Sequence, residues 1–177
     1  MQMDNRIKIM LTDTNEDARS MLREALERTG RFAVICSTGD GGQVLEMIEE
    51  NRPDMLVLDL ILPGLDGLSI LRRLDGKDRP VILAMSNFVT QEVVAEAGNL
   101  GASMFISKPY NESALVDNLI RLADKQETRL HAPGLEELVT SIIHEVGVPA
   151  HIKGYQYVRE AIMITVEDMD VINSVTK

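Results

Sequence analysis

The sequence predicts an α/β fold, in which a five-stranded parallel sheet with helices on both faces precedes a shorter all-α segment. Five short apolar runs recur about every 22 to 26 residues, and apolar residues at helical spacing lie between them. The runs are continuously apolar, as is typical of strands buried on both faces of a parallel sheet. The expected strands are residues 7–11, 33–36, 55–58, 81–85 and 104–106.

The helices between these strands have recognisable starts and stops. Thr14 and Thr90 are expected to cap the first and fourth helices, and Gly30 and Gly101 to end the same two helices. Each strand-helix unit is too short for an inserted subdomain, which favours the doubly wound, flavodoxin-like strand order 2-1-3-4-5. The apolar stripes of the first and fifth helices are Ala18, Met21, Leu22, Ala25 and Leu26, and Leu115, Leu119 and Leu122.

Composition excludes several classes of protein. Of the 177 residues, 45% are apolar and 26% are charged, which excludes disorder as the main state. No apolar run approaches the roughly 20 residues of a membrane span, and the sequence starts without a signal core, so we expect a cytoplasmic protein with no membrane partner. Cys36, the one cysteine, can form neither an internal disulfide nor a cysteine-rich metal site.

The net charge of −10 is spread over the whole sequence. Residues 1–124 carry 13 basic and 20 acidic side chains, a net charge of −7, and residues 125–177 carry 5 basic and 8 acidic side chains, a net charge of −3. Neither part is a basic module. Electrostatics alone therefore gives no case for binding nucleic acid.

Polar side chains follow the expected strands at their carboxyl ends, where ligands bind in folds of this kind. Asp13, Asp59, Ser86 and Lys108 follow strands one, three, four and five. Asp59 alone is equally well read as the cap of the next turn, but two neighbouring carboxylates favour a bridging divalent cation. One carboxylate could then attack phosphorus, with Lys108 balancing the charge and Ser86 bonding the phosphoryl group. Pro109 fixes the loop that carries Lys108, and a cis bond is one option there.

These motifs resemble the receiver domain of bacterial two-component response regulators over residues 5–124. They are Asp13, the string Leu-Asp-Leu-Ile-Leu-Pro-Gly-Leu-Asp-Gly at 58–67, Ser86, and Lys-Pro-Tyr at 108–110. The resemblance implies that Asp59 accepts a phosphoryl group, and that Mg²⁺, or alternatively Ca²⁺ or Mn²⁺, is the cofactor. The roles that it assigns are metal binding by Asp13, Asp59 and the carbonyl of Ile61, phosphoryl contact by Ser86 and Lys108, switching by Ser86 and Phe105, and turns at Pro63, Gly67 and Pro109.

Two positions depart from the family pattern. Receivers usually carry two adjacent acids after the first strand, whereas Thr14 follows Asp13 here. A hydroxyl lacks the charge of a carboxylate, so Thr14 is the weakest member of the expected metal set and the affinity for metal should fall. Asn87 replaces the small residue that usually follows the switch hydroxyl, and would crowd access to the phosphoryl group.

Residues 125–134 are expected to be a linker after a fifth helix that ends near Asp124. Beyond it, one amphipathic helix ends at Gly147 and a second follows. Taken alone, these helices are typical of a docking or dimerising tail. A metal site at His144 and His151 is disfavoured, because Gly147 and Pro149 between them prevent a common helical face. The apolar residues of the two helices are Leu135, Leu138, Val139, Ile142, Ile143 and Val146, and Tyr157, Val158, Ala161 and Ile162.

Residues 141–162 are closely similar to the opening of the DNA-binding domain of the stage-zero sporulation A family, the master transcription regulators of sporulation. In that family the helix-turn-helix lies further downstream. We therefore expect 135–177 to be the first helices of a truncated effector domain, with DNA as a partner of the full-length effector alone.

The leading hypothesis is a phosphorelay response regulator of sporulation type rather than an enzyme. Its expected partners are an upstream histidine kinase or phosphotransferase and, on phosphorylation, a second copy of itself. The alternative is a pseudo-receiver that is not phosphorylated and acts through protein contacts, which Thr14 and Asn87 favour. A phosphatase with an aspartyl-phosphate intermediate is disfavoured, because hydrolysis needs a positioned acid or base and no further carboxylate beside Asp59 is available for that role. A dinucleotide site is disfavoured because strand one lacks a Gly-rich turn.

Overall fold

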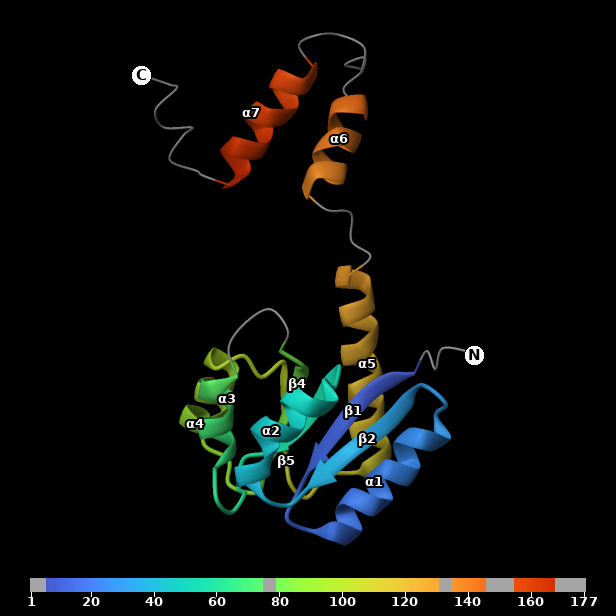
Figure 1. Cartoon of the computed structure of the whole chain (residues 1–177), viewed down its shortest axis with the longest axis vertical. Helices are drawn as coiled ribbons and strands as arrows, with labels where there is room; N and C mark the ends of the chain where they lie inside the picture. Colours follow the sequence, from blue (N-terminus) through green and yellow to red (C-terminus); the bar gives the residue numbers. More distant parts are fainter. Residues whose placement is uncertain (1–5, 75–78, 131–134, 146–154, 168–177) are drawn as a thin grey trace. The chain divides into compact units, whose positions relative to one another are not determined.

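The computed structural model describes residues 6–74, 79–130, 135–145 and 155–167 (Figure 1). The chain divides into two compact units, Met1–Glu127 and Thr128–Lys177. Among the helices of these ranges, none combines the length and the apolar character needed to cross a membrane.

The first unit is built on one five-stranded parallel sheet. Its strands are β1 (Ile7–Thr12), β2 (Phe32–Thr38), β3 (Met55–Asp59), β4 (Val81–Ser86) and β5 (Met104–Ser107). They are hydrogen-bonded in the order β2-β1-β3-β4-β5, which confirms the predicted topology. Since β2 and β3 lie on opposite sides of β1, the carboxyl ends of β1 and β3 open between diverging loops.

Helices cover both faces of the sheet (Figure 1). One face packs against α1 (Glu16–Arg28) and α5 (Glu112–Leu130). The other packs against α2 (Gly41–Asn51), α3 (Gly67–Arg73) and α4 (Gln91–Asn99). Burial on both faces explains why the strands are continuously apolar in sequence.

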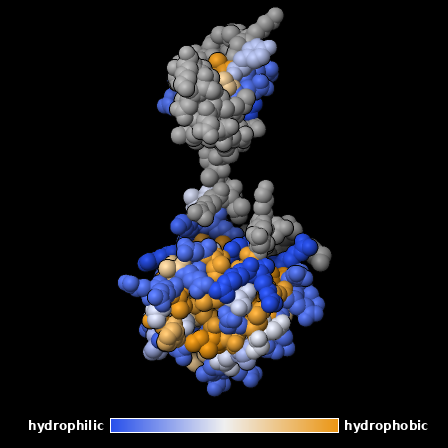
Figure 2. All heavy atoms as spheres, turned by 90° about the vertical axis from the view of Figure 1, so that its left-hand side faces the viewer, coloured by the Kyte–Doolittle hydropathy of each residue, from blue (hydrophilic) through white to orange (hydrophobic). Residues whose placement is uncertain are grey.

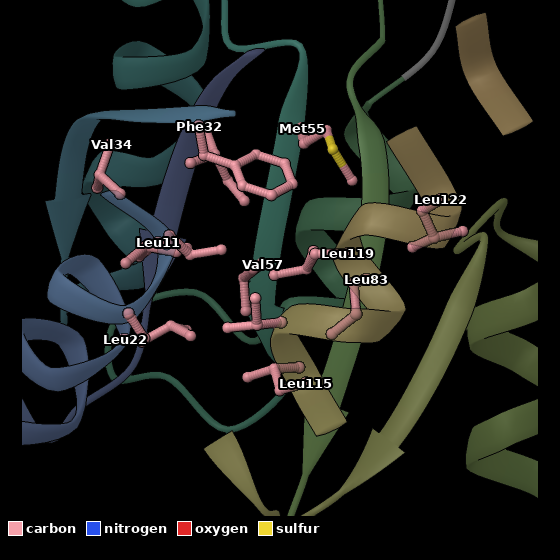
Figure 3. Packing of buried hydrophobic residues seen from close by; sticks show 14 of the residues in the cluster. Leu11, Leu22, Phe32, Val34, Met55, Val57, Leu83, Leu115, Leu119 and Leu122 are labelled. Atoms are coloured by element: carbon pink, nitrogen blue, oxygen red, sulfur yellow. The ribbon is translucent and has the colours of Figure 1, made fainter. Parts of the chain in front are cut away.

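Alternate residues of each strand enter two separate cores. Leu11, Val57 and Leu83 pack with Leu22 of α1 and Leu119 of α5 (Figure 3). Their neighbours along the strands point to the opposite face and pack against α2, α3 and α4. All of these strand residues are fully or almost fully buried. The central strands therefore hold the site loops on a rigid base.

The ends of α1 and α4 test the expected caps. Thr90 caps α4, and its Oγ1 accepts a hydrogen bond from the N–H of Val93 at 3.2 Å. Gly30 and Gly101 lie just beyond the ends of α1 and α4 with φ of 70° and 87°. The expectation for Thr14 was wrong, because the cap of α1 is Asn15, whose Oδ1 accepts from the N–H of Ala18. Asn15 is also a favourable cap residue, so the sequence allowed either start.

The fifth helix is longer than expected. It continues to Leu130, so the expectation of an end near Asp124 was wrong, and residues 125–130 of the expected linker are helical. Those six residues contain neither Gly nor Pro, and most favour helix. Residues 131–134 lie outside the described residues.

The second unit contains α6 (Leu135–Glu145) and α7 (Tyr155–Glu167). Val139, Ile143 and Tyr155 are buried between the two helices, and Ile162 packs against them. Tyr157 and Val158 of α7, which the apolar pattern placed on its packed face, are 75% and 43% exposed. The expected end of the first helix at Gly147 lies outside the described residues, as does His151.

Apolar residues gather on the side of the first unit that carries α3 and α4, which faces the viewer in Figure 2. At the carboxyl end of β4, Phe88 and Val89 are 63% and 46% exposed. These two side chains stand in the loop directly after Ser86, next to the polar edge of the sheet.

Candidate functional site

The structure brings the carboxylates of Asp13 and Asp59 to adjacent strand ends. Both residues are almost completely buried. Thr12 ties the two strands together just before the carboxylates, because its Oγ1 donates to the carbonyl of Val57 at 3.1 Å and accepts from the N–H of Asp59 at 2.9 Å. No role was predicted for Thr12. The available signal was a Thr at the end of an apolar strand, because a hydroxyl that is buried there needs hydrogen-bond partners.

Lys108 joins the two carboxylates from β5. Its Nζ donates to Asp13 Oδ2 and to Asp59 Oδ2, at 2.6 Å in each case. Its own backbone N–H donates to the carbonyl of Ser86 at 2.8 Å, and the peptide bond to Pro109 is cis. Burial lowers the pKa of Lys108, but the hydrogen bonds to Asp13 and Asp59 outweigh this and raise the net pKa above its usual value.

The other oxygen of each carboxylate is held by the backbone. The N–H of Asn15 donates to Asp13 Oδ1, and the N–H of Ile61 donates to Asp59 Oδ1, both at 2.9 Å. All four carboxylate oxygens thus accept a hydrogen bond from the protein. Two carboxylates and one ammonium leave this triad with a net charge of −1, which favours a further cation at the site.

Ser86 ends β4 and is buried, while its hydroxyl is occupied locally. Its Oγ donates to the carbonyl of Phe88 at 2.9 Å and accepts from the N–H of Phe88 at 3.0 Å. Phe105, its expected switch partner, is half-buried on β5, where it pairs with Ala84 and packs into the core on the side of α2, α3 and α4. Ser86 and Phe105 therefore lie on neighbouring strands.

The loop after Asp59 is held at several points. The carbonyl of Pro63 accepts from the N–H groups of Gly41 and Leu65, each at 2.9 Å. Gly67, which was expected in a turn, is instead the first residue of α3. Close packing requires a glycine at this position, since a Cβ at Gly67 would lie 2.6 Å from Cα of Leu60. These contacts hold in place the loop that carries Ile61, two residues after Asp59. The carbonyl of Ile61 is the one expected to bind a cation.

The side chains at this edge suit a hard divalent cation. The Lys108 ammonium contacts Asp13 and Asp59 at once, so one positive centre can reach both carboxylates. Carboxylate and carbonyl oxygens are the ligands that Mg²⁺ prefers. Thr14 is exposed and adds no charge. Within the described ranges, no group of three or more His, Cys, Asp or Glu residues is placed to hold a metal, so a cation here would depend on two carboxylates, backbone oxygen and water.

Comparisons with known proteins agree with this geometry. The family model of the response regulator receiver domain matches residues 9–120, and the chain belongs to that family. Residues 139–177 match a second family model, described as the Sporulation initiation factor Spo0A C terminal. The chain therefore joins a receiver domain to a segment that is similar to the C terminal part of sporulation initiation factor Spo0A.

Solved receiver domains share the fold of the first unit. The receiver domain of the putative response regulator NarL from Mycobacterium tuberculosis is 25% identical, covers 68% of this chain and 98% of its own, and has a TM-score of 0.63. The response regulatory domain of mrkE from Klebsiella pneumoniae is 26% identical, with 69% and 99% covered and a TM-score of 0.63. A LuxR-family two-component response regulator from Aurantimonas is 29% identical, with 67% and 86% covered and a TM-score of 0.59.

Proposed function

We propose that this chain is a phosphorelay response regulator of sporulation type, which accepts a phosphoryl group on Asp59 and thereby controls a DNA-binding transcription effector. The observation that carries the proposal is the buried triad, in which Lys108 contacts both Asp13 and Asp59 at 2.6 Å. The match of residues 139–177 to a sporulation factor supports the sporulation role. The two parts together favour a regulator rather than an enzyme.

The chemistry would transfer a phosphoryl group to one oxygen of Asp59. A lone pair of that oxygen forms the new P–O bond, while the bond from phosphorus to the donor breaks and its electron pair leaves with the donor. Lys108 turns from Asp59 Oδ2 to the phosphoryl oxygens, and Ser86 donates its hydroxyl hydrogen to one of them. Asp13, Asp59 and the carbonyl of Ile61 would hold Mg²⁺. When bound, this cation supplies positive charge against the phosphoryl oxygens.

The donor would be a phosphohistidine on an upstream histidine kinase or phosphotransferase, with the protein working in the cytoplasm. A second copy of the chain is the proposed partner after phosphorylation. DNA is the proposed partner of the effector, to which residues 135–177 would contribute helices. The family to which the chain belongs and the second family match support these proposed partners.

A pseudo-receiver is the second candidate function, and two observations favour it. Thr14 stands where receivers usually have a second acid. In addition, Asn87 stands where receivers usually have a small residue after the switch hydroxyl. Such a module would act through protein contacts without accepting phosphate.

Intact mass after incubation with acetyl phosphate and Mg²⁺ tests the proposal. We expect the mass of one phosphoryl group on the wild-type chain, and its loss in Asp59→Asn and in the presence of a chelator. Asp66→Asn is the matched control, because Asp66 lies in the loop after Asp59, outside the triad, and caps α3. An unmodified wild-type chain would favour the pseudo-receiver, and an increment that persists in Asp59→Asn would overturn the assignment of Asp59.

A further inference from the structure

Arg19 of α1 is hydrogen-bonded to the backbone of Asp13, in the loop after β1. Its Nη1 donates to the carbonyl of Asp13 at 2.5 Å. The N–H of Asp13 donates in turn to the carbonyl of Thr38 at 3.3 Å. The backbone of Asp13 is therefore held on both sides, by α1 through Arg19 and by the end of β2 through Thr38. Both bonds lie next to the carboxylate that contacts Lys108.

Gly39 leaves the space that Arg19 uses. A Cβ at Gly39 would lie 3.0 Å from Arg19 Nη1, 3.0 Å from the Asp13 carbonyl oxygen and 3.4 Å from Cα of Thr14. A side chain at this position would press on the hydrogen bond between Arg19 and Asp13. The glycine therefore allows the loop after β2 to approach the loop after β1.

We propose that Arg19 is a positioning residue, which with Gly39 sets the place of the Asp13 carboxylate and thereby tunes cation binding at the site. This inference rests on the proposed function, because it assumes that Asp13 and Asp59 hold a divalent cation. Thr14 contributes no charge, so Asp13 is the one carboxylate of its loop that faces Asp59. Geometry has a large effect on affinity in a site with few charged ligands.

The charge of Arg19 supports the same role. A guanidinium bonded to the Asp13 carbonyl forms a charge-assisted hydrogen bond, which is stronger and shorter than one between neutral groups. The planar guanidinium is also stiffer than a Lys side chain, and so holds a fixed direction. A shift of the carbonyl would turn the peptide plane and move the carboxylate away from Lys108 and Asp59.

Arg23 provides a matched control on the same helix. It is half-buried like Arg19, and its Nη1 donates to a backbone carbonyl, that of Val34, at 3.0 Å. Val34 lies within β2, away from the carboxylates. If Arg19 has a structural role alone, Arg19→Met and Arg23→Met should have similar effects. If it positions Asp13, the effect on cation binding should be confined to Arg19→Met.

The experiment measures binding of Mn²⁺ to the complete, unphosphorylated chain by the electron paramagnetic resonance signal of the free ion. We expect Arg19→Met to weaken Mn²⁺ binding by roughly tenfold, the lower end of the usual loss when a partner behind a metal ligand is removed. Arg19→Lys should recover only part of the affinity, because it keeps the charge and one donor but lacks the fixed direction of the guanidinium. Arg23→Met should bind as the wild type does. Unfolding in urea, recorded for each variant, checks that all of them are folded.

Gly39→Ala tests the same contact from the opposite side. We expect it to weaken Mn²⁺ binding in the same direction, and to have a smaller effect when Arg19 is already Met. Gly98→Ala is its control, because a Cβ at Gly98 meets nothing within 4 Å.

The outcomes distinguish this inference from the proposed function. If the wild type binds Mn²⁺ and Arg19→Met binds it equally well, the positioning role is overturned while the proposed function stands. Equal weakening by Arg19→Met and Arg23→Met would also overturn it. If the wild type binds no Mn²⁺ at all, both the cation part of the proposed function and this inference fail.

Discussion

The hydroxyl of Ser86 is bound twice to the backbone of Phe88, as a donor to its carbonyl and as an acceptor from its N–H. The same hydroxyl cannot donate to a phosphoryl oxygen while it donates to Phe88. Contact with a phosphoryl group therefore costs the bond to the Phe88 carbonyl, and this loosens the loop after β4, which carries the exposed side chains of Phe88 and Val89. A change in the hydrogen bonds of Ser86 would therefore change the apolar surface that Phe88 and Val89 form.

The first prediction concerns this pair. Phosphorylation of the wild type should speed amide hydrogen exchange at Phe88, by about fivefold if one hydrogen bond of about 1 kcal/mol is lost. In Ser86→Ala the Phe88 amide should exchange fast both before and after phosphorylation, because its acceptor is absent. Ser86→Thr keeps the hydroxyl and should behave as the wild type does. Slow exchange at Phe88 in Ser86→Ala would show that other contacts hold the loop.

The second prediction concerns the missing acid. Thr14→Asp should tighten Mg²⁺ binding by about 1 to 2 kcal/mol, or roughly 5- to 30-fold, because it adds a carboxylate beside Asp13. Thr14→Asn is the control, since it has nearly the same shape as Asp without the charge. Titration calorimetry measures both. Equal affinity in Thr14→Asp and the wild type would mean that water or Asn15 already fills the role.

The placement of the site residues was largely predictable because they stand at strand ends. Once the strand order is known, Asp13 and Asp59 must follow neighbouring strands, and Lys108 must follow a strand that ends at the same edge of the sheet. Those expectations needed the apolar runs and one topological rule. The strands themselves were found to within two residues, because buried runs in a parallel sheet contrast sharply with their flanks.

The parts that were missed depend on contacts between loops. Arg19 looks like any surface arginine of an amphipathic helix, and its bond to the Asp13 carbonyl follows from the path of the loop. Gly67 was expected in a turn, whereas close packing against Leu60 requires it. Thr14 and Asn15 are both good caps, so local propensity could not choose between them. Backbone placement settles such details, and residue type alone does not.

The third prediction concerns the start of α3 and pH. Asp66 caps this helix, accepting from the N–H of Ser69 at 2.9 Å and from its hydroxyl at 2.6 Å. The side-chain hydrogen bond from Ser69 is the main cause that lowers the pKa of Asp66 below its usual 3.8. A carboxyl with a lowered pKa in the folded state contributes stability above its unfolded pKa, and that contribution is lost as pH falls through the folded pKa.

At neutral pH, Asp66→Ala should therefore cost about 1 kcal/mol of unfolding free energy, which is the usual loss for a cap. The difference from the wild type should shrink as the pH falls below 3.8. Asp66→Asn keeps a capping oxygen without a titrating proton, so it should stay close to the wild type at neutral pH. Urea unfolding at a series of pH values measures all three proteins. A cost for Asp66→Ala that is the same at every pH would contradict the contribution of charge.

The fourth prediction concerns the contact between the loops after β2 and β3. Gly41 begins α2, and a Cβ there would lie 1.8 Å from the carbonyl oxygen of Leu65 and 2.8 Å from its carbonyl carbon. These are backbone atoms, so no side-chain rotation can relieve the overlap. The N–H of Gly41 also donates to the carbonyl of Pro63 at 2.9 Å, which keeps the two loops together.

Gly41→Ala should therefore lower the unfolding free energy by an amount near or above the upper end of the roughly 1–3 kcal/mol that overpacking costs. Gly42→Ala is the matched control, because its Cβ would meet the side-chain Oδ1 of Asp40 at 3.2 Å, and a side chain can move by a few tenths of an ångström. Urea unfolding, monitored by circular dichroism, compares the stability of the two variants. Since the loop that moves carries Ile61, Gly41→Ala should also weaken Mn²⁺ binding. Equal stability of the two variants would show that the loops can separate without cost, and that the loop after Asp59 is not held in place by Gly41.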